Sequence, residues 1–276
     1  MYSHAKHLSP PKTAEGLPRS GHGYVTHMRI GSQEIKRVGL GTNRLTNSPE
    51  NRAFLREAVA AGLDHIDTAH LYSNGESERT IGEALAPIPE HVVVATKGGY
   101  HGGGIDRLRI EIDQSLESLR TDSIALFYLH RVDPATPLEE SLGLLAELRD
   151  AGKVQNVGIS DVSIGEIDRA GRVVEIAAVQ NEFNLGERAD DQVVDFCAVE
   201  EIAFVPFFPL RGSSRAVDEI ASAHGVSANQ VKIAWLLKRS RVMAPIPGTR
   251  SLPHLLENLA ALGVELSDDE FERLGG

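Results

Sequence analysis

The sequence predicts a single-domain (β/α)8 barrel, also called a TIM barrel, and three observations support that fold class. The chain has 276 residues, which is enough for one large hydrophobic core. Short apolar runs typical of buried strands alternate with amphipathic stretches typical of helices. Eight strand-plus-helix units follow one another at intervals of about 30 residues with no linker between them.

The eight predicted strands occupy the chain from residue 36 onward. Their expected starting points are Lys36, Asp64, His91, Ile124, Val154, Ile176, Ala203 and Val242. In a barrel of parallel strands, residues at the carboxyl ends of the strands converge on one mouth, and catalytic sites are built there. We therefore expect functional side chains just after these strands.

The segments between the predicted strands carry apolar residues three and four positions apart. This spacing places the apolar side chains on one face of a helix, where they can pack against a sheet. The two clearest series are Ile105, Leu108, Ile112, Leu116 and Leu119, and then Leu138, Leu142, Leu145 and Leu148.

Capping residues mark several helix boundaries. Residues 136–139 offer Thr136 as the N-cap, a proline at the first helical position and a glutamate that closes a capping box. Ser227 and Gln230 form a second capping box. We expect helices to end at glycines that can adopt a left-handed conformation, namely Gly62, Gly152 and Gly171.

A doubly wound parallel sheet is the main alternative fold. Such sheets bind dinucleotides through a glycine fingerprint directly after the first strand. Here residues 39–44 read GLGTNR, which lacks the third glycine of that fingerprint. A dinucleotide bound by this chain would therefore not be held in the Rossmann manner.

The first 27 residues differ in composition from the rest of the chain. They are rich in Pro, Gly, Ser and His and show almost no apolar periodicity. We expect residues 1–27 to form a disordered tail and residues 28–276 to form the barrel.

Charge and cysteine content limit the possible partners. The formal net charge of −11 disfavours binding to nucleic acid and to anionic membranes, and no run of 18 apolar residues is present. The single cysteine, Cys197, cannot form an intramolecular disulfide and is expected to be a buried thiol. We expect a cytoplasmic monomer or small homo-oligomer that acts on a small molecule.

Four chemically active residues lie at or just beyond the ends of predicted strands. Asp67, Lys97 and His130 end the apolar runs 62–67, 92–97 and 124–130, and Tyr72 follows five residues after Asp67. Each residue alone has a structural explanation: a helix cap, a solvated strand end, a buried histidine or a surface aromatic. Together, at one mouth, they form a device for proton transfer.

The chemistry of this group suits carbonyl reduction. Hydride addition to a carbonyl creates an alkoxide that must receive a proton, and the phenol of Tyr72 can donate it. We expect the Lys97 ammonium to lower the pKa of Tyr72, and Asp67 to fix the charge and position of Lys97. His130 can hydrogen-bond the carbonyl oxygen beside Tyr72 and complete an oxyanion pocket.

The sequence around these residues resembles the aldo-keto reductases. The motif IDTAHLY at residues 66–72 is followed by GESE at 75–78 and IGEAL at 81–85. Further similar blocks are ATKGG at 95–99, LHRVDP at 129–134, VGIS at 157–160, VQNEFN at 179–184, PIPGTR at 245–250 and ENL at 257–259. The blocks follow the order of the family from about residue 29 to residue 274, so the resemblance covers nearly the whole globular part. It implies a (β/α)8 barrel, the four catalytic residues above, and NADPH as the cofactor.

The resemblance also implies a set of residues that contact the cofactor. Ser160, Asp161 and Gln180 match positions that hold the nicotinamide amide, and Phe207 matches the aromatic ring that stacks on it. The remaining cofactor positions implied are Gly41, Thr42, Asp67, Phe208, Pro209, Leu210, Gly212, Gly248, Thr249, Arg250, His254, Glu257 and Asn258.

Several of these positions lead to specific expectations. Asp161 stands where asparagine is usual, so a carboxylate replaces an amide donor. Arg250 follows the phosphate-binding loop and can bind the 2′-phosphate that distinguishes NADPH from NADH. His254, Glu257 and Asn258 are three and four residues apart, and we expect them to share one face of a helix that begins near Leu252.

Three other functions fit parts of the sequence. Lys97 at a strand end could form a Schiff base as in an aldolase, although Asp67 would favour its charged form. The chain could also be a cofactor-binding barrel without catalytic activity, as are some relatives of this family. A metal-dependent hydrolase is disfavoured because His65, His70, His101 and His130 include no His-x-His pair and no carboxylate cluster accompanies them.

The substrate is not readable from the sequence. The chain ends at Gly276, where longer members of the family continue into a segment that folds over the barrel mouth. We therefore expect a more open substrate pocket than in those longer members.

Overall fold

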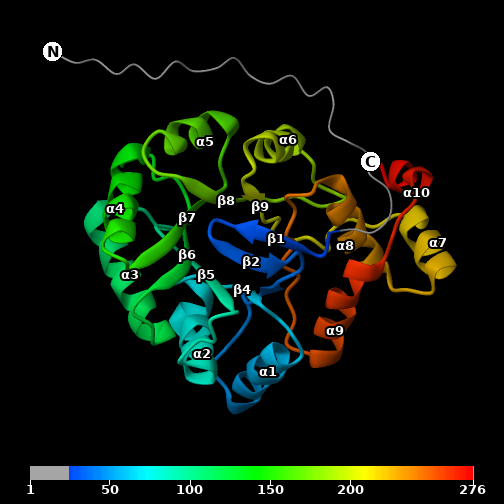
Figure 1. Ribbon diagram of the computed structural model, residues 1–276, viewed down its shortest axis with the longest axis horizontal. Helices are drawn as coiled ribbons and strands as arrows, with labels where there is room; N and C mark the ends of the chain where they lie inside the picture. The colour runs from blue at the N-terminus through cyan, green and yellow to red at the C-terminus, as the bar shows by residue number, and fades with distance from the viewer. Residues whose placement is uncertain (1–24, 276) are drawn as a thin grey trace.

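The computed structural model describes residues 25–275, and these fold into a ring of parallel strands surrounded by helices (Figure 1). The strands of the ring are β3 (Leu40–Gly41), β4 (His65–Asp67), β5 (Val93–Gly98), β6 (Ile124–Leu129), β7 (Val154–Ser160), β8 (Ile176–Gln180) and β9 (Ala203–Phe204). They pair in sequence order, each parallel to the next. The predicted α/β barrel class is confirmed.

Helices cover the outside of this sheet. They are α1 (Pro49–Ala60), α2 (Glu76–Leu85), α3 (Gly104–Leu119), α4 (Leu138–Asp150), α5 (Ile164–Gly171), α6 (Asp191–Glu200), α7 (Arg215–His224), α8 (Ala228–Arg239), α9 (Leu252–Ala260) and α10 (Asp268–Arg273). Two short 3-10 helices, η1 (Tyr72–Gly75) and η2 (Ala261–Gly263), complete the described elements. The main core lies between sheet and helices, and a second core fills the barrel interior.

The eighth predicted strand is present only as an extended segment that closes the ring. Residues 242–248 bridge β9 at Met243 and β3 at Gly248, in parallel orientation on both sides. The ladder is interrupted because Pro245 and Pro247 have no N–H to donate. Their carbonyl oxygens still accept bonds from the N–H groups of residues 39 and 41, at 3.0 and 3.3 Å. The segment therefore occupies the eighth position without forming a regular strand.

The first predicted strand was placed too early in the sequence. Lys36 ends β2 (Gln33–Lys36), which pairs antiparallel with β1 (His27–Ile30), and the first barrel strand begins at Leu40. This hairpin covers one end of the barrel (Figure 1). Its Ile30 and Ile35 are buried against interior residues of the barrel strands. The residues around Lys36 therefore belong to this hairpin and not to the first barrel strand.

The structure describes only the last three residues of the expected 1–27 tail. Strand β1 begins at His27, so this last residue of the expected 1–27 tail is already in regular structure. The rest of that prediction concerns residues 1–24, which lie outside the described residues.

Most predicted helix signals agree with the structure, with three exceptions. The capping box at Ser227 and Gln230 forms, and Gly62 and Gly152 have left-handed φ values of 95° and 77°. Thr136 does not cap α4, because its hydroxyl instead donates to the carboxylate of Asp133 at 2.8 Å. The other two exceptions are Gly171, which is the last residue of α5, and Ile105, which is exposed at the start of α3.

Candidate active site

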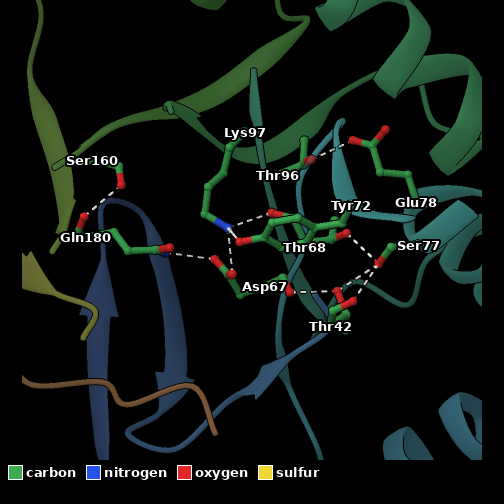
Figure 2. Close-up of polar contacts among 10 residues, drawn as sticks. All are labelled: Thr42, Asp67, Thr68, Tyr72, Ser77, Glu78, Thr96, Lys97, Ser160 and Gln180. Atoms are coloured by element: carbon green, nitrogen blue, oxygen red, sulfur yellow. Dashed lines mark hydrogen bonds and ion pairs between the residues drawn. The ribbon is translucent and has the colours of Figure 1, made fainter. Parts of the chain in front are cut away.

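Three of the four predicted catalytic side chains form one connected group (Figure 2). The Lys97 ammonium lies 2.6 Å from the Asp67 carboxylate and 3.4 Å from the Tyr72 hydroxyl. It also donates to the backbone oxygen of Thr68 at 2.7 Å. Asp67 and Lys97 are almost completely buried, with 1% and 0% exposure. An ion pair so shielded from water fixes the position of the ammonium beside the phenol.

The parallel strands bring these residues to one mouth. Asp67 is the last residue of β4, Lys97 is the second-last of β5, and His130 directly follows β6. The His130 ring lies edge-on to the Tyr72 ring, with 6.1 Å between centroids. The predicted convergence of the four residues is therefore present in the structure.

A tight loop holds Tyr72 over the barrel. Ser73 and Asn74 in η1 have φ values of 50° and 54°, in the left-handed region that few side chains adopt. Ser77 anchors the loop from below: its hydroxyl contacts that of Thr68 at 2.8 Å and donates to that of Thr42 at 2.9 Å. Thr42 in turn donates to the backbone oxygen of Asp67 at 2.8 Å (Figure 2). The Tyr72 loop is thus tied to the ends of β3 and β4.

Burial sets the charge states of the group. Desolvation raises the pKa of Tyr72, and the nearby Lys97 offsets this effect only in part. Lys97 lowers the Tyr72 pKa as we expected, but the larger effect of burial leaves this pKa above its ordinary value. Tyr72 therefore keeps its proton through the neutral range.

Lys97 and His130 respond to burial in different ways. Burial alone would lower the pKa of Lys97, but Asp67 and Tyr72 together raise it above its ordinary value. Burial and the charge of Lys97 lower the pKa of His130 to about 3. The site therefore presents a charged ammonium, a protonated phenol and a neutral imidazole.

The residues expected near the nicotinamide lie beside this group. The side-chain amide of Gln180 donates to the second carboxylate oxygen of Asp67 at 2.8 Å, and the Ser160 hydroxyl donates to the Gln180 backbone oxygen at 2.8 Å. Asp161 has a φ of 60°, a conformation that asparagine and aspartate tolerate better than other side chains. Its half-exposed carboxylate pairs with Arg131 at 3.5 Å.

A cavity of about 270 Å³ opens above Tyr72 and His130, and we call it the central cavity. Its lining comprises Gly41, Thr42, Asn43, Asp67, Tyr72, Tyr100, His130, Arg131, Ser160, Asp161, Gln180, Phe207, Phe208, Pro209, Ile246 and Gly248. Phe208 has a φ of 52°, which is rare for a bulky residue, and its ring is exposed with the Arg211 guanidinium 3.6 Å above it. The expected aromatic pair therefore reaches the cavity.

The central cavity continues into a second groove of about 410 Å³, which we call the arginine groove. It is lined by Gly41, Thr42, Asn43, Arg44, Leu45, Phe208, Pro209, Leu210, Arg211, Pro247, Gly248, Thr249 and Arg250. Six of these residues also line the central cavity, so the two form one channel. The groove lining includes three arginines and no carboxylate, which suits an elongated ligand with several phosphates.

Two glycines predicted to contact the cofactor have clear structural roles. A Cβ atom at Gly41 would lie 2.7 Å from the Ile246 backbone oxygen, so the chain can close here only with glycine. Gly212 has a φ of 81° and packs against Gly186. It supports the loop but does not line either cavity.

The predicted contacts on α9 are the least well placed. None of His254, Glu257 and Asn258 lines the groove. All three lie in α9 at the expected spacing, but His254 is exposed, Glu257 is partly buried and Asn258 is buried. Glu257 accepts a hydrogen bond from Ser227, the N-cap of α8, because α9 packs against α8.

Sequence reasoning missed several residues that line the channel. These are Asn43, Arg44, Leu45, Tyr100, Arg131, Arg211, Ile246 and Pro247. Asn43, Arg44, Tyr100 and Arg131 follow barrel strands within three residues, so the strand-end rule could have found them. The others depend on how loops fold back over the mouth.

Residues 25–275 contain neither a cluster of metal ligands nor a membrane-spanning helix. No group of three or more His, Cys, Asp and Glu side chains there could hold a metal ion. None of the helices in that range combines the length and the apolar character needed to cross a membrane.

The fold is an α/β barrel with a buried polar group at its mouth, and sequence comparison identifies the chain as an oxidoreductase of a known family. The sequence model of the aldo/keto reductase family matches residues 37–216 and 213–275. The chain belongs to the aldo-keto reductase family. Members of this family carry out NADP-dependent carbonyl reduction.

Individual relatives agree with this assignment. Pyridoxine 4-dehydrogenase of Escherichia coli (strain K12) is 34% identical over 275 residues, covering 90% of this chain and 96% of that protein. The crystal structure of the thermostable aldo-keto reductase Tm1743 with the inhibitor epalrestat has a TM-score of 0.84 at 29% identity, covering 90% and 98% of the two chains. A Klebsiella pneumoniae aldo/keto reductase in complex with NADP and acetate has a TM-score of 0.80 at 26% identity, covering 90% and 94%.

Proposed function

We propose that this protein reduces aldehydes and ketones to alcohols with NADPH as the reductant. The observation that carries the proposal is the buried Asp67–Lys97–Tyr72 group at the floor of the central cavity. The solved Klebsiella relative that contains NADP supports the choice of cofactor, as does the arginine groove that continues from the cavity.

In this mechanism the protein supplies the proton and the oxyanion pocket. The substrate carbonyl oxygen lies between the Tyr72 hydroxyl and the His130 ring, and both groups donate hydrogen bonds to it. NADPH, when bound, supplies the hydride. Tyr72 transfers its proton to the oxygen as negative charge develops there, and the Lys97 ammonium stabilises the phenolate that remains. Asp67 keeps Lys97 charged and in place.

Residues around the channel would hold the cofactor. Ser160 and Gln180 lie where the nicotinamide amide is expected, and Phe207 or Phe208 offers a ring for stacking. Thr249 and Arg250, at the start of α9, face the groove that would take the phosphates. We propose that His254, Glu257 and Asn258, on the helix that follows Arg250, contact the adenosine end of the cofactor beyond the groove.

The charge state of Lys97 bears on the competing lyase function. A Schiff base requires a neutral amine, whereas Asp67 and Tyr72 raise the Lys97 pKa. Reduction with borohydride in the presence of an aldehyde, followed by mass spectrometry, would reveal an adduct on Lys97 if the lyase reading were correct. We expect no adduct.

An NADPH-oxidation screen tests the proposed function. The panel comprises aromatic aldehydes, dicarbonyls, quinones, sugars and pyridoxal, the last because one relative is a pyridoxine 4-dehydrogenase. Turnover by the wild type and its loss in Tyr72→Phe would support the proposal. Tight NADPH binding with no turnover of any carbonyl would instead support a cofactor-binding protein without catalytic activity.

The proposal also covers the cellular compartment and the oligomeric state of the protein. Cys197 is buried and free, which is compatible with the reducing cytoplasm where NADPH-dependent reduction would take place. We propose a cytoplasmic monomer or small homo-oligomer.

A further inference from the structure

A second cavity lies on the other side of Tyr100 and His130 from the arginine groove. It has a volume of about 380 Å³, and we call it the histidine cavity. Its lining comprises His70, Leu71, Asn74, Gly75, Lys97, Gly98, Tyr100, His101, Arg107, Glu111 and His130. Because Tyr100 and His130 line both this cavity and the central cavity, a substrate whose carbonyl meets His130 can extend into either space.

The histidine cavity is rich in hydrogen-bond donors that have no protein acceptor. Arg107 uses its Nε to bind Glu111 at 3.0 Å, and neither terminal nitrogen is bonded to another described residue. The guanidinium end can therefore donate two parallel hydrogen bonds. The His101 ring, which is exposed, and the Asn74 side chain also have no hydrogen-bond partner among residues 25–275.

Two histidines present buried ring nitrogens near the same space. His130 has a buried Nδ1 with no hydrogen-bond partner, and so does His70. His70 lies 3.8 Å from the carboxylate of Glu78, which is completely buried behind it. The contact with Glu78 raises the pKa of His70, so this ring gains a proton more readily than a free histidine.

The carboxylates around this cavity face donors of the protein itself. Glu111 is the only carboxylate in the lining, and it accepts from Arg107 and from the Gly99 backbone N–H at 2.7 Å. Glu78 lies behind the lining, accepts from Thr96 through one oxygen, and faces His70 with the other, which has no hydrogen-bond partner in the described chain. The lining itself therefore offers a ligand the two free terminal nitrogens of Arg107, while both oxygens of its one carboxylate, Glu111, already accept hydrogen bonds. An acceptor-rich group, above all an anion, satisfies that arrangement.

We propose that the histidine cavity binds the anionic tail of the substrate, a carboxylate or a phosphate, with Arg107 as its principal partner. The inference rests on the proposed carbonyl reduction, because the tail is placed relative to the oxygen between Tyr72 and His130. It defines the preferred substrates as aldehydes or ketones that carry a negative charge away from the carbonyl.

Matched substrate pairs test the proposal. One pair is 4-carboxybenzaldehyde and 4-formylbenzamide, which differ in charge but little in size. The other is pyridoxal 5′-phosphate and pyridoxal, which tests a phosphate in place of a carboxylate. We expect the wild type to favour at least one charged member by kcat/KM, and the pair that shows the preference identifies the anion.

The variant Arg107→Met tests the assigned partner. We expect it to reduce kcat/KM for the charged substrate about thirtyfold and to leave the neutral partner nearly unchanged. Arg107→Lys should restore only part of the preference, because an ammonium cannot donate the bidentate pair. Arg109→Met is the matched control: Arg109 lies on the same helix but binds Glu147 outside the cavity.

A binding measurement separates this inference from the proposed reaction. Titration of 4-carboxybenzaldehyde into the NADP+ complex involves no hydride transfer, and its Kd should rise about thirtyfold in Arg107→Met. Equal kcat/KM for charged and neutral members of both pairs would overturn the anionic subsite while leaving carbonyl reduction intact. An equal loss of kcat/KM for the charged and the neutral substrate in Arg107→Met would show that Arg107 has only a structural role. No turnover of any aldehyde, with anion binding that still depends on Arg107, would overturn the reaction alone.

Discussion

At the scale of single residues, the candidate site keeps the Lys97 ammonium buried away from water, beside the phenol of Tyr72. Lys97 is fully buried, yet it remains an ammonium because Asp67 lies 2.6 Å away. Gln180 occupies the other oxygen of that carboxylate. Each polar atom of the group thus has a defined partner, and the phenol of Tyr72 lines the central cavity.

Removal of the Tyr72 hydroxyl should stop the reaction without disturbing the cofactor. We expect Tyr72→Phe to lose most carbonyl reduction while its NADPH Kd, measured by fluorescence titration, stays nearly unchanged. Lys97→Met should be about as damaging, and the double variant little worse than either, because the residues act as a unit. Wild-type turnover by Tyr72→Phe on two aldehydes would contradict the assigned proton donor.

Buried histidine should make the fold sensitive to acid. His65 is fully buried, neither ring nitrogen has a hydrogen-bond partner in the described chain, and burial lowers its pKa to about 4. The unfolded chain binds this proton below about pH 6.5, whereas the folded chain does not. His65 therefore destabilises the fold as the pH falls from about 6.5 to about 4, by on the order of 3 kcal/mol.

Urea unfolding of the wild type and His65→Gln at pH 7 and pH 5 measures this contribution. We expect the loss of unfolding free energy between the two pH values to be smaller in the variant. The exposed His91→Gln should behave as the wild type. An identical pH dependence in all three proteins would show that His65 does not remain neutral in the fold.

At the scale of elements, the barrel interior is filled by pairing large residues with glycines on neighbouring strands. The Tyr128 ring on β6 lies directly over Gly158 on β7, and these two residues are in register. A Cβ atom at Gly158 would lie 2.4 Å from that ring. The position of the Tyr128 ring therefore requires a glycine at residue 158.

Gly158→Ala should be destabilising although alanine suits a strand better than glycine does. The ring and strand cannot both stay in place, and we expect a loss of about 1–3 kcal/mol in unfolding free energy. Gly165→Ala, in helix α5 with no atom within 4 Å of the added Cβ, is the control and should stabilise by about 0.5–1 kcal/mol. Chemical denaturation measures both, and equal stability of the two variants would refute the packing argument.

At the scale of the whole molecule, the cofactor channel exists because the two ends of the barrel sheet meet. Gly41 on β3 bridges Gly248 in the closing segment, although 207 positions separate them in sequence. The loops that flank this seam contribute Arg44 and Arg250 to the arginine groove. Neither arginine forms an ion pair with another described residue.

Arg250 should determine which dinucleotide is used. Loss of one charge-assisted contact to the 2′-phosphate costs about 2 kcal/mol, or roughly thirtyfold. We expect Arg250→Ala to raise the NADPH Kd by about that factor and to leave NADH almost unaffected. Arg44→Ala, across the same groove, shows whether the phosphate is shared between the two. A wild type that prefers NADH, or equal weakening of both cofactors, would exclude Arg250 as the phosphate partner.

Local sequence signals predicted much of the fold. The strand ends near Asp67, Lys97 and His130 could be predicted from the sequence because buried parallel strands are continuous apolar runs. The β1–β2 hairpin was missed because its short alternation resembles the start of a barrel strand. The eighth strand was expected as regular, but two prolines remove the N–H groups that would define it.

The sequence by itself determined the fold class and the family, and it named the candidate catalytic group, since these depend on residue type and on order along the chain. Only the tertiary structure decided the charge states, because burial of Tyr72 and His130 depends on what packs around them. It alone showed that Tyr100 and Arg107 face the mouth and that Glu257 is bonded to Ser227. Contacts between segments far apart in the sequence leave no periodic pattern in that sequence. They can therefore be identified only from the folded barrel.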